Sequence, residues 1–171
     1  GLLLIASKKR LLQRYATQTF NYDFPEALLE GMNAGELVAW MTETEGTFSI
    51  AVNIGDTFDY GAMEKAGWQA MKNHRLFIED DDTLLILPYS QYSFACDQNK
   101  GQVEIIEGLS GVMSISKGWY RVDIVGALHD PSLTDEDEEE DEDVSGEFII
   151  FLTPSIPVRD KESYPDIPRF S

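Results

Sequence analysis

The chain has 171 residues, of which 13 are Lys or Arg and 31 are Asp or Glu, so its formal net charge is −18. Hydrophobic residues make up 43% of the chain and aromatic residues 11%, which supports a folded core and excludes wholesale disorder. The charge argues against nucleic-acid binding by the chain itself, because the neutralisation of phosphates requires cations.

Cys96 is the single cysteine, which excludes an intrachain disulfide and a cysteine-based metal site. It lies in an apolar stretch, and we interpret it as a small buried hydrophobic residue in a strand rather than a catalytic thiol. The absence of disulfides is typical of the reducing cytoplasm, the location we expect. The longest uninterrupted apolar runs are about five residues, whereas a membrane-spanning helix needs about 20, so we expect no membrane partner.

The first 24 residues are compatible with two local structures. Leu4, Leu11, Leu12 and Tyr15 could share one face of a helix, whereas the partial alternation after Arg14 favours a strand. Residues 25–31 then predict a short helix, with proline in its first turn and glycine at its end.

A change of period follows in the next fifty residues. The segments 37–41 and 47–54 predict two strands, and Glu45-Gly46 between them predicts a hairpin connection. Helical spacing returns over 61–74, although two glycines weaken that pattern.

The second half of the chain has mostly β character. The apolar or alternating stretches that predict strands are 76–78, 84–87, 89–96, 103–106, 112–115, 119–125 and 148–152. Short strands separated by turns indicate a mainly β protein, α+β by element count, built as an antiparallel β-sandwich with one or two short helices. We assign residues 1–153 to a single β-sandwich domain.

Two segments stand apart in composition. Residues 135–143 are nine consecutive acidic residues that carry half of the net charge; because like charges repel, we expect a loop. Residues 154–171 contain four of the seven prolines, and we expect a tail that is extended along the surface or partly disordered.

The acidic run does not match a calcium-binding loop. In an EF-hand that begins at Asp135, the glycine position is occupied by Glu140 and the bidentate glutamate position by Gly146. Weak, non-selective binding of cations and a purely solubilising role both remain open.

The usual catalytic signatures are missing. There is no G-x-S-x-G, H-E-x-x-H, P-loop or G-x-G-x-x-G sequence, and His74 and His129 are the only histidines. His129 and Asp130 are adjacent and would point to opposite faces of a strand, which argues against a dyad. Nothing distinguishes a glycosidase pair among the 31 acids. We therefore expect a protein that is not an enzyme and needs no cofactor or metal.

One stretch resembles a known family. A strand ends at Leu87-Pro88, Val112–Ile115 follows, and Gly118-x-Tyr120-x-Val122 enters a further strand before Glu147–Ile150 completes the sheet. This order over residues 84–152 resembles the β-rich core of competence protein J, a small bacterial inhibitor of a DNA-entry nuclease. The resemblance implies an antiparallel β-sandwich that binds an enzyme partner, and it assigns no functional residue.

These observations predict a cytoplasmic, bacterial-type binding domain, an acidic inhibitor or immunity-type protein for a basic nuclease or toxin. The residues expected to contact that partner belong to the two acidic clusters: Glu79, Asp80, Asp81, Asp82, Asp135, Asp137, Asp141 and Asp143. The alternative is a small-ligand or carbohydrate-binding domain that uses exposed tryptophans among Trp40, Trp68 and Trp119.

Overall fold

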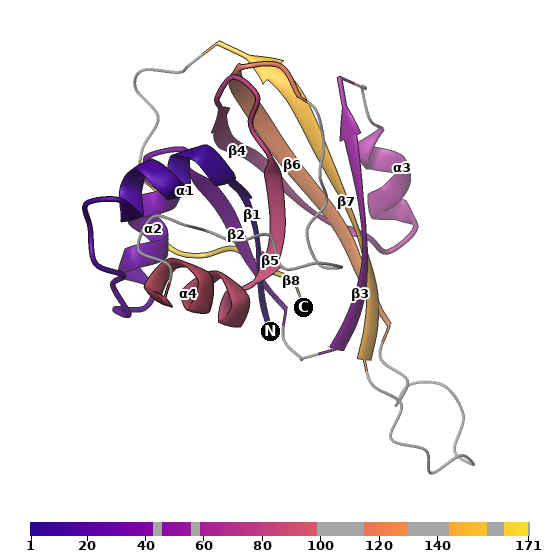
Figure 1. Cartoon of the computed structure of the whole chain (residues 1–171). Helices are drawn as coiled ribbons and strands as arrows, with labels where there is room; N and C mark the ends of the chain where they lie inside the picture. The colour runs from indigo at the N-terminus through magenta and orange to yellow at the C-terminus, as the bar shows by residue number, and fades with distance from the viewer. Residues whose placement is uncertain (43–45, 56–58, 99–114, 130–143, 157–162, 171) are drawn as a thin grey trace.

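The computed structural model describes residues 1–42, 46–55, 59–98, 115–129, 144–156 and 163–170. Within them the chain forms eight strands and four helices (Figure 1). In chain order the elements are β1 (Leu2–Ser7), α1 (Lys8–Tyr15), α2 (Glu26–Asn33), β2 (Leu37–Thr42), β3 (Gly46–Ile54), α3 (Tyr60–Lys65), β4 (Gln69–Ile78), β5 (Leu84–Pro88), α4 (Tyr89–Gln98), β6 (Gly118–His129), β7 (Val144–Ser155) and β8 (Arg169–Phe170).

The strands form two four-stranded sheets, with the orders β5-β1-β2-β8 and β3-β7-β6-β4. The prediction of a mainly β protein is confirmed. The prediction of purely antiparallel sheets is wrong, because β2 pairs with β8 and β3 with β7 in parallel. Both parallel pairs join strands that are distant in sequence, and no hairpin signal could have revealed them.

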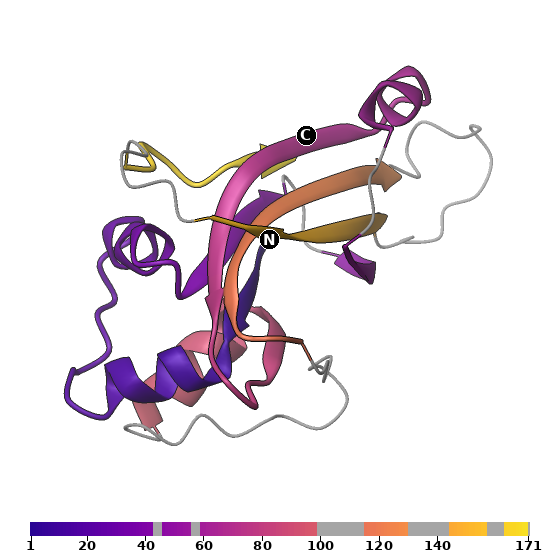
Figure 2. The ribbon, with the colours of Figure 1, turned by 90° about the horizontal axis from the view of Figure 1, so that it is seen from above.

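The molecule has three layers. One apolar cluster joins the two sheets and includes Trp40 of β2, Phe148 of β7 and Phe170 of β8. A second cluster covers the opposite face of the β5-β1-β2-β8 sheet with side chains of α1, α2 and α4. Figures 1 and 2 show these three helices on one side of the molecule and α3 at the far side, beyond the β3-β7-β6-β4 sheet.

Several predicted elements lie where the patterns placed them. The helix over 25–31 is α2, and the strands over 37–41 and 47–54 are β2 and β3. The hairpin at Glu45-Gly46 is wrong, because β2 and β3 belong to different sheets. The strand expected after Arg14 is also wrong, because α1 occupies residues 8–15 and no strand follows before α2.

Two longer segments differ from the prediction. The helix expected over 61–74 is only the six-residue α3, and the chain enters β4 at Gln69. The strand expected over 89–96 is the helix α4, which buries Tyr92, Ala95 and Cys96. Positions 92, 95 and 96 follow helical spacing, so the contact of one helix face with the second cluster outweighs the alternation. The predicted strands 103–106 and 112–115 fall outside the described residues, except Ile115.

The end of the chain is part of the core. Ile167 is 2% exposed, Phe170 is fully buried, and β8 pairs with Met41 and Thr42 of β2. The expected boundary after residue 153 also falls inside β7, which ends at Ser155. The segment 163–170 is extended, as expected, but it closes one edge of a sheet rather than lying on the surface.

Candidate functional site

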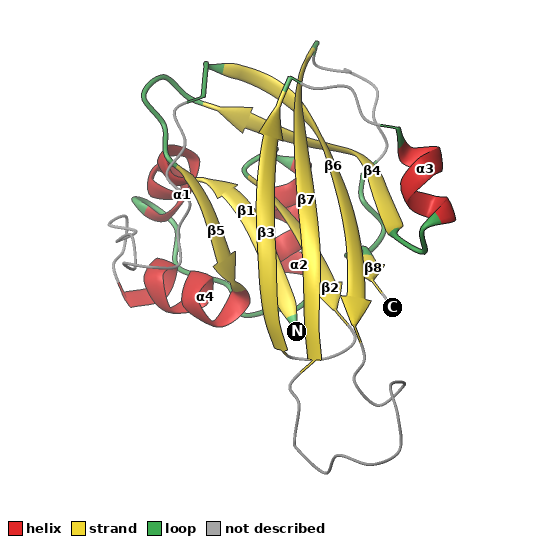
Figure 3. Ribbon diagram, turned by 90° about the vertical axis from the view of Figure 1, so that its right-hand side faces the viewer, coloured by secondary structure: helices red, strands yellow, loops and turns green. Residues whose placement is uncertain are grey.

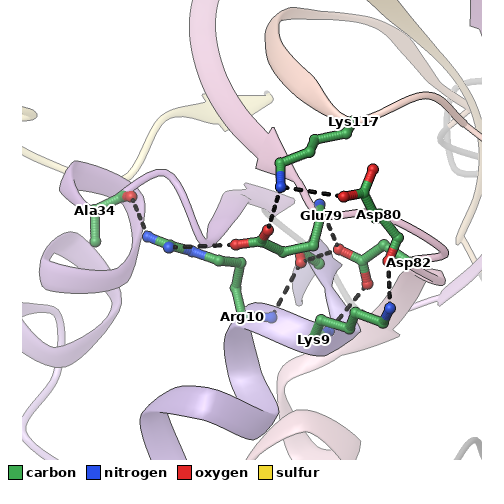
Figure 4. Close-up of polar contacts among 8 residues, drawn as sticks. Lys9, Arg10, Ala34, Glu79, Asp80, Asp82 and Lys117 are labelled. Carbon is green, nitrogen blue, oxygen red and sulfur yellow. Dashed lines mark hydrogen bonds and ion pairs between the residues drawn. The ribbon is translucent and has the colours of Figure 1, made fainter.

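The predicted acidic cluster Glu79–Asp82 lies where the chain crosses from one sheet to the other. β4 ends at Ile78 in one sheet and β5 begins at Leu84 in the other, so residues 79–82 span the two layers. The first turn of α1 lies beside this crossing (Figure 4). We refer to residues 79–82 with Lys9, Arg10 and Lys117 as the crossing cluster.

Asp82 is the structural centre of the crossing cluster. It is 7% exposed, and its carboxylate accepts hydrogen bonds from the Ser7 hydroxyl and from the backbone N–H of Lys9 at 2.9 Å. Two further N–H groups, of Glu79 at 3.1 Å and Thr83 at 2.8 Å, donate to the same carboxylate. Ser7 in turn caps α1 by accepting from the Arg10 N–H. Asp82 therefore joins β1, α1 and the crossing, and is not displayed to a partner.

Basic side chains surround the other carboxylates of the cluster. Glu79, whose side chain is 18% exposed, lies 3.7 Å from both the Arg10 guanidinium and the Lys117 ammonium. Asp80 is 76% exposed and accepts from Lys117 at 3.2 Å, while Lys9 donates to its backbone carbonyl. The hydrogen bond and charge of Asp80 raise the pKa of Lys117. Figure 4 shows the three basic side chains converging on the crossing, Lys9 and Arg10 from α1 and Lys117 from the residue before β6.

The expected patch of acids is consequently close to neutral. Three basic residues balance Glu79, Asp80 and Asp82, and Asp81 is the remaining exposed acid, at a turn with a φ of 50°. The expectation that all four acids are exposed is wrong for Asp82. No local pattern indicates the burial of Asp82 or the balance of charge, because the balancing cations lie about 70 positions earlier and about 37 positions later in the chain.

Most of the negative charge lies outside the described residues. Of the 31 acids and 13 bases, the described ranges hold 14 acids and 10 bases, a net charge of −4. The remaining −14 belongs to the segments that the structure does not describe, which include Asp135, Asp137, Asp141 and Asp143. The described residues are thus almost balanced in charge, whereas the whole chain is not.

A second polar centre, missed by the sequence analysis, is formed by Asp123 of β6. Its carboxylate is 3% exposed and accepts from the Tyr60 hydroxyl at 2.5 Å and the Asn73 N–H at 2.6 Å. Arg121 lies 3.0 Å away. Burial, and then the bond to Asp123, raise the pKa of Tyr60 to about 12. A lone acid within the otherwise apolar run 122–125 was the available signal for a buried carboxylate.

The Asp123 centre fastens α3 to the β3-β7-β6-β4 sheet. Tyr60 is the first residue of α3, and Asn73 lies in the β4 irregularity between Met71 and His74, with a φ of 67°. The Asp123 carboxylate accepts the N–H that this irregularity turns toward β6. Because Asp123 is buried, the centre has a structural role and offers no route for a substrate.

The other candidate residues are placed mostly in the core. Cys96 is buried as expected, in a helix rather than a strand, and burial raises the pKa of its thiol to about 12, which disfavours the reactive thiolate. His74 is buried and stacks on Tyr164 at 5.3 Å between ring centroids. The side chain of His129 is not described.

The tryptophans do not form an exposed platform together. Trp40 is fully buried, which removes it from the alternative prediction of a carbohydrate site. Trp119 is half-buried against Phe77 at 5.2 Å, and its ring passes so close to Gly35 that a Cβ there would lie 2.4 Å from it. Trp68 is also half-buried.

Among the described residues, no group of three His, Cys, Asp or Glu side chains is arranged to bind a metal. No helix in the same part of the chain is long and apolar enough to cross a membrane. Comparison with protein-family models, with curated proteins and with solved structures gave no match.

Proposed function

We propose that the protein is a non-enzymatic, cytoplasmic binding domain for a basic protein partner, such as a nuclease or a toxin. The observation that carries this proposal is the concentration of charge in residues 135–143, nine consecutive acids that hold half of the net charge of −18. A run of acids without a base among them attracts a cation-rich surface.

The proposal assigns different roles to the two acidic clusters. Glu79 and Asp82 serve the fold, because their carboxylates bind groups of the same chain. Asp80 and Asp81 offer exposed carboxylates, but Lys9 and Lys117 lie beside them. The residues 135–143, nine acids without a base among them, therefore provide the main attraction.

Binding kinetics with a panel of basic nucleases test this proposal. Replacing the nine acids at 135–143 by Asn and Gln should slow association strongly and flatten its dependence on salt, since steering acts on the encounter rate. The variant Asp80→Asn/Asp81→Asn in the crossing cluster serves as the control and should change association less. Polylysine controls for non-specific attraction, and a true partner should be bound at a fixed stoichiometry.

Two results would contradict the proposal. Binding to a nuclease with an unchanged association rate after neutralisation of 135–143 would show that charge steering is not the mechanism. Equal binding of polylysine and of every nuclease in the panel would show unspecific attraction in place of recognition. Capture of a partner from the native host would then identify the molecule that is bound.

A further inference from the structure

In the part of the chain that the structure describes, the two sheets have four edge strands, and three of these edges carry features that block further pairing. β5 has five residues and ends at Pro88, and β8 has two residues that follow Pro168. Along β4 the register with β6 is broken between Met71 and His74. Amides at its outer edge also donate hydrogen bonds to other parts of the chain. Short strands, prolines and irregularities are the usual means by which proteins prevent association through sheet edges.

The amides of the β4 edge are bonded within the chain. The Arg75 N–H donates to the Tyr164 hydroxyl at 3.0 Å, and the Phe77 N–H donates to the Gly35 carbonyl at 2.8 Å. The C-terminal segment and the turn after α2 therefore cover this edge. No equivalent cover is formed along β3 by the described residues.

β3 is a long edge strand without any of these features. Its nine residues, Gly46–Ile54, contain no charge and no proline, and they pair with β7 in one unbroken register. Figure 3 shows β3 at the border of its sheet, with β7 on one side. An uncharged edge strand of this length is unusual in a protein with a net charge of −18.

The hydrogen bonding of β3 defines which backbone groups face outward. Gly55 donates its N–H to Leu152 of β7 at 2.9 Å. Because backbone groups alternate in direction along a strand, those of residues 49, 51 and 53 also point toward β7. The N–H and C=O groups of Phe48, Ile50 and Val52 then point to the open edge, while their side chains pack on the cluster between the sheets.

We propose that β3 pairs with β3 of a second copy of this chain, antiparallel and about a two-fold axis at Ile50. This register places Phe48 opposite Val52 of the second copy, so the outward backbone groups exchange hydrogen bonds. On the exposed face it places Ser49 opposite Ala51 of the second copy, two small side chains that fit without a clash or a charge. The β3-β7-β6-β4 sheet of one copy and the same sheet of the second copy become one continuous sheet of eight strands.

The antiparallel orientation limits the charge repulsion between the two copies. Gly46 pairs with Val144, the residue that follows the acidic run in the sequence. Antiparallel pairing puts the Val144 residues of the two copies at opposite ends of the shared strands, roughly 26 Å apart along the strands at about 3.3 Å per residue. This exceeds the Debye length of about 8 Å at physiological salt. A basic partner, in contrast, finds no carboxylate on β3.

Sedimentation and light scattering of the full chain test the proposal, and the design uses the pairing of residue 49 with residue 51. The wild type should have twice the 19.3 kDa mass of one chain. The variant Ser49→Glu/Ala51→Glu places like charges opposite each other at both pairs, so its mass should halve. The variant Ser49→Lys/Ala51→Glu changes the same positions but places opposite charges together, so it should remain a dimer. Circular dichroism confirms that both variants are folded.

Hydrogen exchange adds a readout along the strand itself. The amides of Phe48, Ile50 and Val52 should exchange more slowly as protein concentration rises, while the amide of Ala51, bonded to β7, should be protected at every concentration. A monomeric wild type, or a dimer that persists in Ser49→Glu/Ala51→Glu, would overturn the proposal. Dimerisation should strengthen as salt rises, because salt screens the repulsion between two chains of charge −18. Binding to a basic partner should weaken as salt rises. The failure of one proposal is therefore distinguishable from the failure of the other.

Discussion

Replacing Asp82 should destabilise the protein far more than replacing its neighbour Asp80. The Asp82 carboxylate accepts four hydrogen bonds, from the Ser7 hydroxyl and the N–H groups of Lys9, Glu79 and Thr83. At a net contribution of roughly 1 kcal/mol each, Asp82→Ala should lower the free energy of unfolding by about 4 kcal/mol. For a domain of this size the melting temperature should fall by roughly 8–16 °C.

Urea unfolding of three variants isolates this effect. Asp80→Ala removes an equal charge from the same turn, but its side chain is 76% exposed, so its effect should be about 0.5 kcal/mol or less. Ser7→Ala removes one hydrogen-bond donor to Asp82 and the N-cap of α1, at about 1–2 kcal/mol. The double variant Ser7→Ala/Asp82→Ala should be less destabilised than the sum, because the two residues share a bond. Equal losses for Asp82→Ala and Asp80→Ala would refute the structural role of Asp82.

Three further predictions concern separate parts of the fold. Gly118→Val should lower the free energy of unfolding by roughly 1–3 kcal/mol through backbone strain alone, because Gly118 has a φ of 149° and a Cβ there meets nothing within 4 Å; near-normal thermal stability would contradict this. Replacing 135–143 by a short Gly/Ser loop should leave thermal stability equal or higher, because self-repulsion is removed, and a large fall in melting temperature would show ordered contacts. Since the pKa of Tyr60 is raised to about 12, folding stability should decline as pH rises from about 10 to 12, and Tyr60→Phe should make that decline shallower in denaturant titrations; identical profiles would contradict the bond to Asp123.

The local patterns of the sequence predicted individual elements better than their partners. Apolar or alternating stretches located β2, β3, β6 and β7 to within about four residues, because the apolar pattern is a property of each strand alone. Pairing depends on contacts between distant segments. The parallel pairing of β3 with β7 joins residues about 98 positions apart, which no local turn signal reports.

The net charge of the candidate site also depends on contacts between distant segments. A run such as Glu79–Asp82 is recognisable as acidic from the sequence, but its net charge in the fold depends on Lys9, Arg10 and Lys117, which other elements bring to it. Proximity of acids in the sequence therefore overestimated the exposed negative charge at this position. Asp123 is the opposite case, because an acid inside an apolar strand already indicates a buried carboxylate with donors around it.

In the C-terminal segment, the structure differs most clearly from what the composition predicted. Its prolines predicted a tail, but they do not prevent single apolar side chains from entering the core. Phe170 is fully buried, with its ring 5.1 Å from that of Phe148 and its edge near Gly126. Ile156, in contrast, is 85% exposed.

Phe170→Ala should therefore be among the most destabilising single changes in the chain. Loss of a buried phenylalanine leaves a cavity between the two sheets and should lower the free energy of unfolding by about 3–5 kcal/mol, measured by urea denaturation. Ile156→Ala in the same region of sequence is the control and should change it by about 0.5 kcal/mol or less. Phe170→Leu should lie between them, because it refills part of the cavity. If Phe170→Ala were as mild as Ile156→Ala, the segment would rest on the surface and the core would close without it.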